Sequence, residues 1–237
     1  MSKKYTYEEF LQIIETLRSE NGCPWDREQT HESLRPCMTE EAAELLAAIR
    51  ILQKTNNPEN LIEELGDVLL QVVMHAQIAS EEGLFTMEDV VNGIAEKMVH
   101  RHPHVFGETK VDSTAKVLEN WDEIKKKEKE GKDWVESPLK EIPMELPALT
   151  RASKVLKKAD KYYGKHHTLK EDVEALQKAV DAIKDLQEET KEPEDERYKT
   201  QMANLLMAIA DIAQQKKLSL EQILADKIED FIEECEG

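Results

Sequence analysis

Apolar residues recur three and four positions apart along most of the chain, which is the spacing of amphipathic helices. The first of these helices begins after Thr6, which forms a capping box with Glu9, and runs to about residue 20. A turn-rich segment, Asn21–Asp26, follows and is predicted to be a loop. The pattern then predicts helices at about 31–54, 58–80, 86–101 and 114–130.

A group of prolines divides the chain into two parts. Pro138, Pro143 and Pro147 interrupt any helical pattern. Beyond them the pattern predicts helices at about 148–160, 169–189, 195–217 and 219–234. We therefore expect a helical domain at 1–130, a proline-containing linker at 131–147 and a second helical unit at 148–237.

The composition agrees with an all-α fold class. Glycine and proline number only 8 each in 237 residues, whereas good helix formers are abundant. The formal net charge is −18, from 50 acidic and 32 basic residues, so the chain would repel a nucleic-acid backbone. The charge therefore disfavours a duplex-binding function, whereas free nucleotides remain possible ligands because a bound metal can neutralise their phosphates.

The cysteines and the hydropathy indicate a cytoplasmic protein. Cys23, Cys37 and Cys235 are too few and too scattered for a disulfide framework or a structural zinc site. The chain begins without the apolar stretch of a signal peptide, and no apolar run approaches the roughly 20 residues of a membrane span. We expect reduced thiols, a cytoplasmic location and no membrane partner.

Four acidic residues on two predicted helices are candidate metal ligands. Glu41 and Glu44 are three apart on one helix, and Glu64 and Asp67 are three apart on the next, so each pair projects from one helix face. If the helices pack side by side, all four carboxylates come together. Their hard oxygen ligands and excess negative charge suit Mg²⁺ or Mn²⁺.

An isolated Glu-x-x-Glu pair in so acidic a chain is more often a solvated helix face. The surroundings of Asp67 change this interpretation, because it is the only formally charged residue between Leu65 and Ser80. A lone carboxylate in an otherwise apolar helix would be costly to bury without a partner. A divalent cation is the simplest partner.

Several motifs in the first half resemble one protein family. They are Gly22–Pro36 (GCPWDREQTHESLRP), Glu40–Glu44 (EEAAE), Glu63–Asp67 (EELGD) and Arg101–Gly107 (RHPHVFG). In combination they closely resemble the MazG family of all-α nucleoside triphosphate pyrophosphohydrolases. The chain departs from the usual family pattern at Cys37 and Ala43, where aromatic residues are common, which leaves base selectivity open.

The resemblance implies a reaction and a set of site residues. The family converts a nucleoside triphosphate and water to the monophosphate and pyrophosphate, with Glu41, Glu44, Glu64 and Asp67 matching its metal motif. Either Glu41 or Glu44 is the candidate base that activates water. Lys97 and Arg101 match a basic pair that contacts phosphates, although their spacing alone also fits a solvated face. The family resemblance further implies a homodimer.

Aromatic and histidine residues near these motifs have two interpretations each. Trp25 could stack on a nucleotide base or anchor its loop on the helices, and the second is the commoner role. His100, His102 and His104 superficially resemble a metal cluster, but Pro103 interrupts their spacing and we expect them to be structural or capping residues.

The second half looks like a degenerate copy of the first. Adding 137 to each residue number places Lys178, Asp181, Gln201 and Asn204 opposite Glu41, Glu44, Glu64 and Asp67. The apolar pattern persists, but three of the four acids are lost. We therefore expect tandem helical units of which the second has a structural or dimer-forming role.

Two other functions fit parts of the pattern. A phosphoribosyl-ATP or deoxyuridine nucleotide pyrophosphohydrolase would share the helices and the acids, but the motif around Trp25 and the segment His102–Phe106 favour the MazG family. A non-catalytic helical scaffold for dimerisation or regulation would need no metal. Metal binding to the folded chain would raise its melting temperature and so separate the scaffold from the enzyme.

Overall fold

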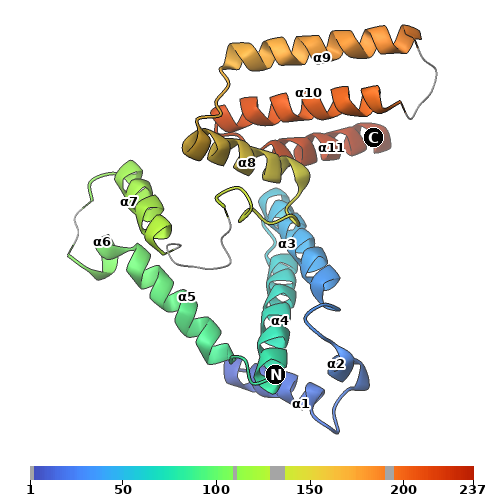
Figure 1. Cartoon of the computed structure of the whole chain (residues 1–237). Coiled ribbons are helices and arrows are strands. Elements are labelled where there is room, and N and C mark those ends of the chain that lie inside the picture. Colours follow the sequence, from blue (N-terminus) through green and yellow to red (C-terminus); the bar gives the residue numbers. More distant parts are fainter. Residues whose placement is uncertain (1–2, 109–110, 129–136, 190–194) are drawn as a thin grey trace. The chain divides into compact units, whose positions relative to one another are not determined.

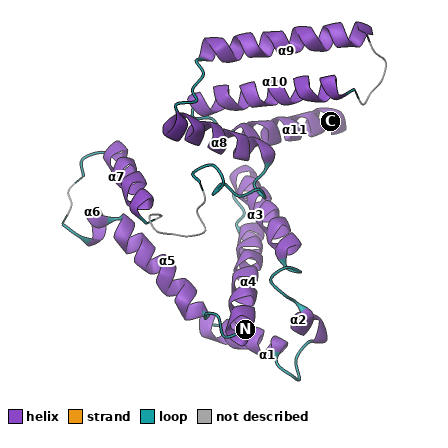
Figure 2. Cartoon of the chain, in the orientation of Figure 1, coloured by secondary structure: helices purple, strands orange, loops and turns teal. Residues whose placement is uncertain are grey.

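A computed structural model describes residues 3–108, 111–128, 137–189 and 195–237. Within these ranges the regular elements are helices, and no strand occurs (Figure 2). The all-α prediction is confirmed. The chain divides into two compact units, residues 1–128 and 129–237, each of which is described separately. None of the described helices is both long and apolar enough to cross a membrane.

The first unit is built around two long helices that run side by side, α3 and α4 (Figure 1). The remaining helices are short or peripheral. In chain order the helices are α1 (Tyr7–Arg18), α2 (Pro24–Glu28), α3 (Arg35–Thr55), α4 (Glu59–Glu81), α5 (Met87–Arg101), α6 (Pro103–Phe106) and α7 (Thr114–Lys127).

Side-chain caps set the starts of several helices, including the Thr6–Glu9 capping box that the sequence predicts. Thr6 and Glu9 form the capping box of α1, and Thr86 forms one with Asp89 at α5. Asn57 Oδ1 accepts a hydrogen bond of 2.9 Å from the backbone N–H of Glu59 at the start of α4. These bonds satisfy amides that have no partner within the helix.

Two predictions near α3 are wrong in detail. The segment at 21–26 is not loop throughout, because Pro24 opens the short helix α2 with a proline at its first position. The next helix begins at Arg35 instead of residue 31, and residues 31–34 form turns. Pro36 has no N–H to donate, so it fits only in the first turn of α3, where the amides lack helical partners.

The core of the first unit is formed by residues from three separate parts of the chain. Five buried apolar residues form its centre: Ile14, Leu34, Val73, Met74 and Ile78. They bring α1, the start of α3 and the second half of α4 together. Burying a side chain of this kind contributes about 1.5–3 kcal/mol, so this cluster fixes the C-terminal half of α4 against α1.

Beside this core two histidines stack on each other. The rings of His31 and His75 are 5.0 Å apart between centroids and nearly parallel, and their Nδ1 atoms lie 2.8 Å apart. Burial and then the neighbouring His31 lower the pKa of His75 from 6.5. At this distance one Nδ1 donates a proton to the other. At least one of the two rings is therefore neutral, because the accepting nitrogen carries no proton.

The histidine pair predicts an acid-sensitive first unit. Because the pKa of His75 is lower in the folded than in the unfolded chain, its stabilising effect is complete above about pH 6.5 and is lost as the pH falls through the folded pKa. We expect the melting temperature to fall between pH 7 and pH 5. His31→Gln should reduce this fall, which thermal unfolding at several pH values measures. An unchanged pH profile in that variant would contradict the assignment.

The second unit has four helices, α8 (Ala148–Tyr163), α9 (Leu169–Glu189), α10 (Glu196–Gln215) and α11 (Leu220–Glu236). Helices α9 and α10 lie side by side, and α8 packs against α10 and α11 (Figure 1). These four helices match the predicted ones to within a few residues.

Part of the predicted linker lies outside the described residues, namely 131–136. The described part, 137–147, packs on α8. Lys158 Nζ donates a hydrogen bond of 2.9 Å to the carbonyl of Pro138 and pairs with Glu141, and Ile142 is buried. This proline-rich segment therefore covers a face of the second unit.

Candidate active site

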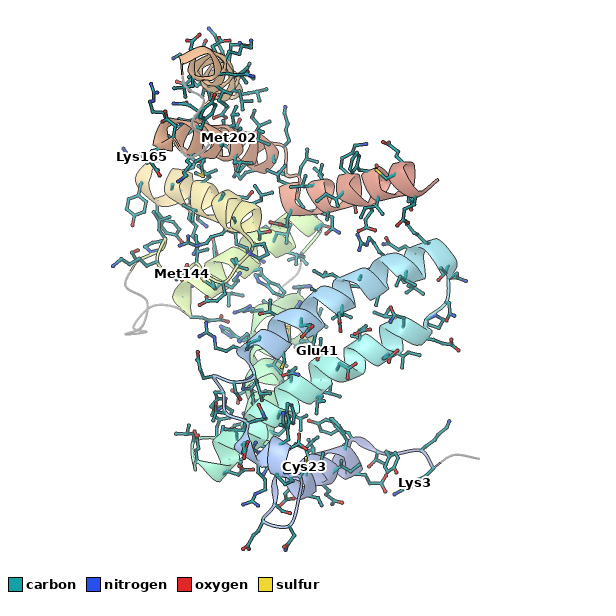
Figure 3. The ribbon with its side chains drawn as sticks, turned by 90° about the vertical axis from the view of Figure 1, so that its right-hand side faces the viewer. Lys3, Cys23, Glu41, Met144, Lys165 and Met202 are labelled. Atoms are coloured by element: carbon teal, nitrogen blue, oxygen red, sulfur yellow. The ribbon has the colours of Figure 1, made fainter. Side chains whose placement is uncertain are left out.

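Three of the four predicted metal ligands come together between α3 and α4. Glu41, Glu64 and Asp67 each offer a carboxylate oxygen, and these oxygens all lie within 4.8 Å of one another. Glu41 lies on the side of α3 that faces α4 (Figure 3). The antiparallel pairing of two helices whose acids are spaced one turn apart produces this convergence.

Glu44 is the predicted ligand that does not join this group. It lies one turn after Glu41 on α3 and is exposed to solvent. Its charge still acts on Glu41, so it lies near the edge of the cluster. A carboxylate in this position is free to accept a proton or to reach the group after a change of side-chain rotamer.

The carboxylates that surround Glu41 affect its pKa. Desolvation raises the pKa of the Glu41 carboxyl above its usual value, and neighbouring carboxylates raise it further. These neighbours, in order of decreasing effect, are Asp67, Glu44, Glu40 and Glu64. A group of carboxylates that disfavours its own ionisation is a group that gains from a bound cation.

The two predicted phosphate-binding cations lie on α5. This helix packs on α4, α6 and α7, and its C-terminal end diverges from α3 and α4 (Figure 1). Arg101 forms an ion pair of 2.6 Å with Glu128 and lies over the ring of Trp121. Lys97 is exposed. The part of α5 that carries both residues thus diverges from α3 and α4, and their role in phosphate binding stays a prediction.

The loop that carries Trp25 is held by a residue that the sequence patterns did not indicate. Arg18, at the end of α1, donates hydrogen bonds to the carbonyls of Asp26 (2.5 Å) and Gln29 (3.2 Å) and pairs with Glu81 at 2.7 Å. Its side chain is only 5% exposed. Trp25 itself is 60% exposed on α2, which leaves its ring available for stacking.

One of the three histidines near α5 has the capping role expected. His102 ends α5 and begins α6, and its Nδ1 lies 2.6 Å from the carbonyl of Met98. Its ring packs edge-on against Trp121 and beside His104. In the described part of the chain these residues are not among the groups able to hold a metal ion.

The corresponding positions of the second unit hold a different set of groups. Lys178, Gln201 and Asn204 line one pocket between α9 and α10, where the first unit has Glu41, Glu64 and Asp67. Asp181 lies on the surface and binds Gln177 and Lys184. A lysine and two amides cannot supply the negative charge that Mg²⁺ requires.

The fold and the site define a class: all-helical proteins in which two antiparallel helices bring acidic pairs together. The family model of the MazG nucleotide pyrophosphohydrolase domain matches residues 29–106, which include all four acids. The nucleoside triphosphate pyrophosphohydrolase/pyrophosphatase MazG of Thermotoga maritima is 39% identical over 227 residues, 96% of this chain and 83% of that protein. The chain belongs to the MazG family.

Two further relatives match the chain over a shorter stretch. The uncharacterized protein YabN of Bacillus subtilis is 51% identical over 153 residues, which is 65% of this chain and 30% of that protein. A nucleoside triphosphate pyrophosphohydrolase of Escherichia coli is 44% identical over 149 residues, 62% of this chain and 55% of that protein. The chain thus spans a third to a half of these two relatives, and the family predicted from the motifs is confirmed.

Proposed function

We propose that the first unit hydrolyses nucleoside triphosphates to the monophosphate and pyrophosphate with the help of Mg²⁺. The observation that carries this proposal is the convergence of Glu41, Glu64 and Asp67 between α3 and α4. Membership of the MazG family and the names of the Thermotoga and Escherichia relatives support the same reaction.

The donor set fits a hard divalent cation. Three carboxylate oxygens within 4.8 Å of one another and a raised pKa at Glu41 are what a Mg²⁺ or Mn²⁺ site presents before the ion binds. Glu41, Glu64 and Asp67 would hold the ion. When bound it would withdraw charge from the phosphates and make water easier to deprotonate.

The remaining residues then divide the other tasks. Glu44 is the better candidate for the base that takes a proton from the attacking water, because Glu41 is one of the three converging groups and Glu44 is not. Lys97 would neutralise phosphate oxygens, and Trp25 would stack on the base. Water attack at the α-phosphorus breaks the bond to the β-phosphate oxygen and releases pyrophosphate.

The products test the reaction directly. Incubation of the chain with ATP, dATP and the other triphosphates in the presence of Mg²⁺ should give the monophosphate and pyrophosphate in equal amounts, and chelation should stop the reaction. Chromatography resolves these products from the diphosphate and phosphate. Primary release of the γ-phosphate would contradict attack at the α-phosphorus even if the triphosphate were consumed.

We also propose that the chain acts as a homodimer. Large apolar side chains are exposed along the long helices of the first unit, among them Leu46 (61%), Ile62 (67%) and Leu65 (52%) on α3 and α4 and Val91 and Ile94 on α5. A second copy that covers these side chains would recover the free energy of their burial. Light scattering that gives the mass of one chain would contradict the dimer.

The formal charge of −18 supports free nucleotides, and not a nucleic-acid duplex, as the partners. The free thiols of Cys23, Cys37 and Cys235 support a reducing compartment such as the cytoplasm. Gel-shift experiments with duplex DNA at low salt and localisation of a tagged chain test these two points.

A further inference from the structure

We propose that the second unit holds a divalent transition metal of the Zn²⁺ class through His167, Asp172 and Asp211. This would be a metal centre of its own, different in position and in chemistry from the carboxylate cluster of the first unit. One ligand atom from each of the three residues lies within 4.8 Å of the others.

The three residues meet at one end of the unit. His167 precedes α9, Asp172 lies in the first turn of α9, and Asp211 lies near the end of α10. Because α9 and α10 run side by side in opposite directions, the start of one and the end of the other are neighbours (Figure 1). The site is therefore built on two rigid helices and one short connection.

The distances fit shared coordination better than hydrogen bonding. His167 Nδ1 lies 3.6 Å from Asp172 Oδ1 and 3.5 Å from Asp211 Oδ2, so one ring nitrogen faces two carboxylates at more than hydrogen-bond length. Metal–ligand bonds of about 2.0–2.1 Å at a tetrahedral angle would place neighbouring ligand atoms about 3.4 Å apart. The observed separations are close to this value.

The two aspartates are buried. Asp172 is 2% exposed and Asp211 is 8% exposed. The Asp211 carboxylate lies 3.5 Å from the His167 ring nitrogen, a distance too long for a strong hydrogen bond. Two adjacent buried carboxylates are costly unless a cation lies between them.

A further residue holds two of the proposed ligands in place. Gln215 Nε2 donates a hydrogen bond of 2.7 Å to Asp172 Oδ2 and one of 3.2 Å to the backbone carbonyl of His167. The first bond orients the carboxylate so that its other oxygen, Oδ1, faces the imidazole. Outer hydrogen bonds of this kind commonly orient the ligands of metal sites.

The site opens into a pocket of about 350 Å³. Its wall includes His167, Asp172 and Asp211, together with Lys178, Gln201 and Asn204. Three protein ligands leave at least one coordination position for water or an anion, and Lys178 supplies a positive charge on the same wall. The positions that correspond to Glu41, Glu64 and Asp67 of the first unit thus line the same pocket as the three proposed ligands.

The mixed donor set selects the class of metal. An imidazole nitrogen with two carboxylates suits Zn²⁺, Co²⁺ or Ni²⁺, whereas Mg²⁺ and Ca²⁺ prefer oxygen alone. We therefore expect the two units to differ in selectivity: Mg²⁺ at the first and Zn²⁺ at the second.

The test uses the full chain with Glu64→Gln and Asp67→Asn, so that the first site does not contribute. Calorimetric titration with Zn²⁺ should show one saturable site that His167→Ala removes, with affinity reduced at least about tenfold by Gln215→Leu. His167 has a side chain 65% exposed, so its removal leaves the packing intact. Circular dichroism of each variant verifies the fold.

The neighbouring histidine gives a matched control. His166 is exposed and belongs to none of the candidate metal groups in the described residues, so His166→Ala should keep the site. Any zinc bound by the cysteine thiols would be the same in both histidine variants, so it does not affect the comparison between them. Equal zinc binding in His166→Ala and His167→Ala, or no saturable site in the starting chain, would overturn the proposal.

Discussion

Replacing Glu64 by glutamine should reduce Mg²⁺-dependent hydrolysis of nucleoside triphosphates by more than about a hundredfold, or about 2.7 kcal/mol in the barrier. The change keeps the size of the side chain and removes one of three converging ligand charges. Asp67→Asn should have an effect of the same order. Steady-state rates over a range of Mg²⁺ concentrations measure both the loss of turnover and any weaker metal binding.

The second unit supplies the matched control, because it already carries these amides. Gln201→Glu and Asn204→Asp restore the lost acids there, yet Lys178 still lines the same pocket. The rate should therefore not change. Two results together would show that the active half has been wrongly assigned. They are full activity in Glu64→Gln and a loss of activity when the surroundings of Asp181 are disrupted.

The same variants separate the metal site from a structural role. Without metal, Glu64→Gln and Asp67→Asn remove like charges that raise the pKa of Glu41, so the folded chain should be at least as stable as the original. With Mg²⁺ the original chain should gain stability and the variants should gain less. Thermal unfolding with and without Mg²⁺ distinguishes these two effects from a loss of packing.

The helices could be predicted because their signals are local. Capping residues such as Thr6 and Thr86 and the apolar spacing lie within a few positions of the bonds they form. The start of α3 was predicted too early because a proline such as Pro36 is compatible both with a kink inside a helix and with its first turn. Only the packing of Leu34 in the core shows which applies.

The carboxylate site could also be predicted in large part. One unpaired charge in an apolar helix indicated Asp67, and antiparallel packing of successive helices brings it opposite Glu41. The same criterion applies to Asp211, which is the only charged residue in the apolar stretch from Leu205 to Ala213. Asp211 lies at none of the four positions that correspond to the Mg²⁺ motif, so the repeat pattern does not indicate it.

Contacts between distant charged residues left no signal in the sequence. Arg101 and Lys97 share a helix face, but the pairing of Arg101 with Glu128 depends on where α7 packs. Arg18 and Glu81 are 63 residues apart, and both look like ordinary surface residues at the ends of amphipathic helices. Such pairs follow from tertiary packing and not from local periodicity.

The Arg18 contact leads to the second large expected effect. Arg18→Ala should reduce the free energy of unfolding of the first unit by about 2–4 kcal/mol. The guanidinium is 5% exposed and binds the carbonyls of Asp26 and Gln29. Its loss leaves these acceptors without their donor and frees the segment that carries Trp25. Chemical denaturation measures this loss of stability. The KM for the triphosphate should also rise, because the segment that carries Trp25 is no longer held in place.

A change at the partner shows which contacts of Arg18 matter. The side chain of Glu81 is 38% exposed, so its ion pair with Arg18 is partly screened by water. Glu81→Gln should therefore cost less than about 1 kcal/mol, because the bonds from Arg18 to the two carbonyls remain. If Glu81→Gln is as destabilising as Arg18→Ala, the ion pair and not the loop carbonyls holds α1, α2 and α4 together. An unchanged KM in Arg18→Ala would show that substrate binding does not depend on the position of Trp25.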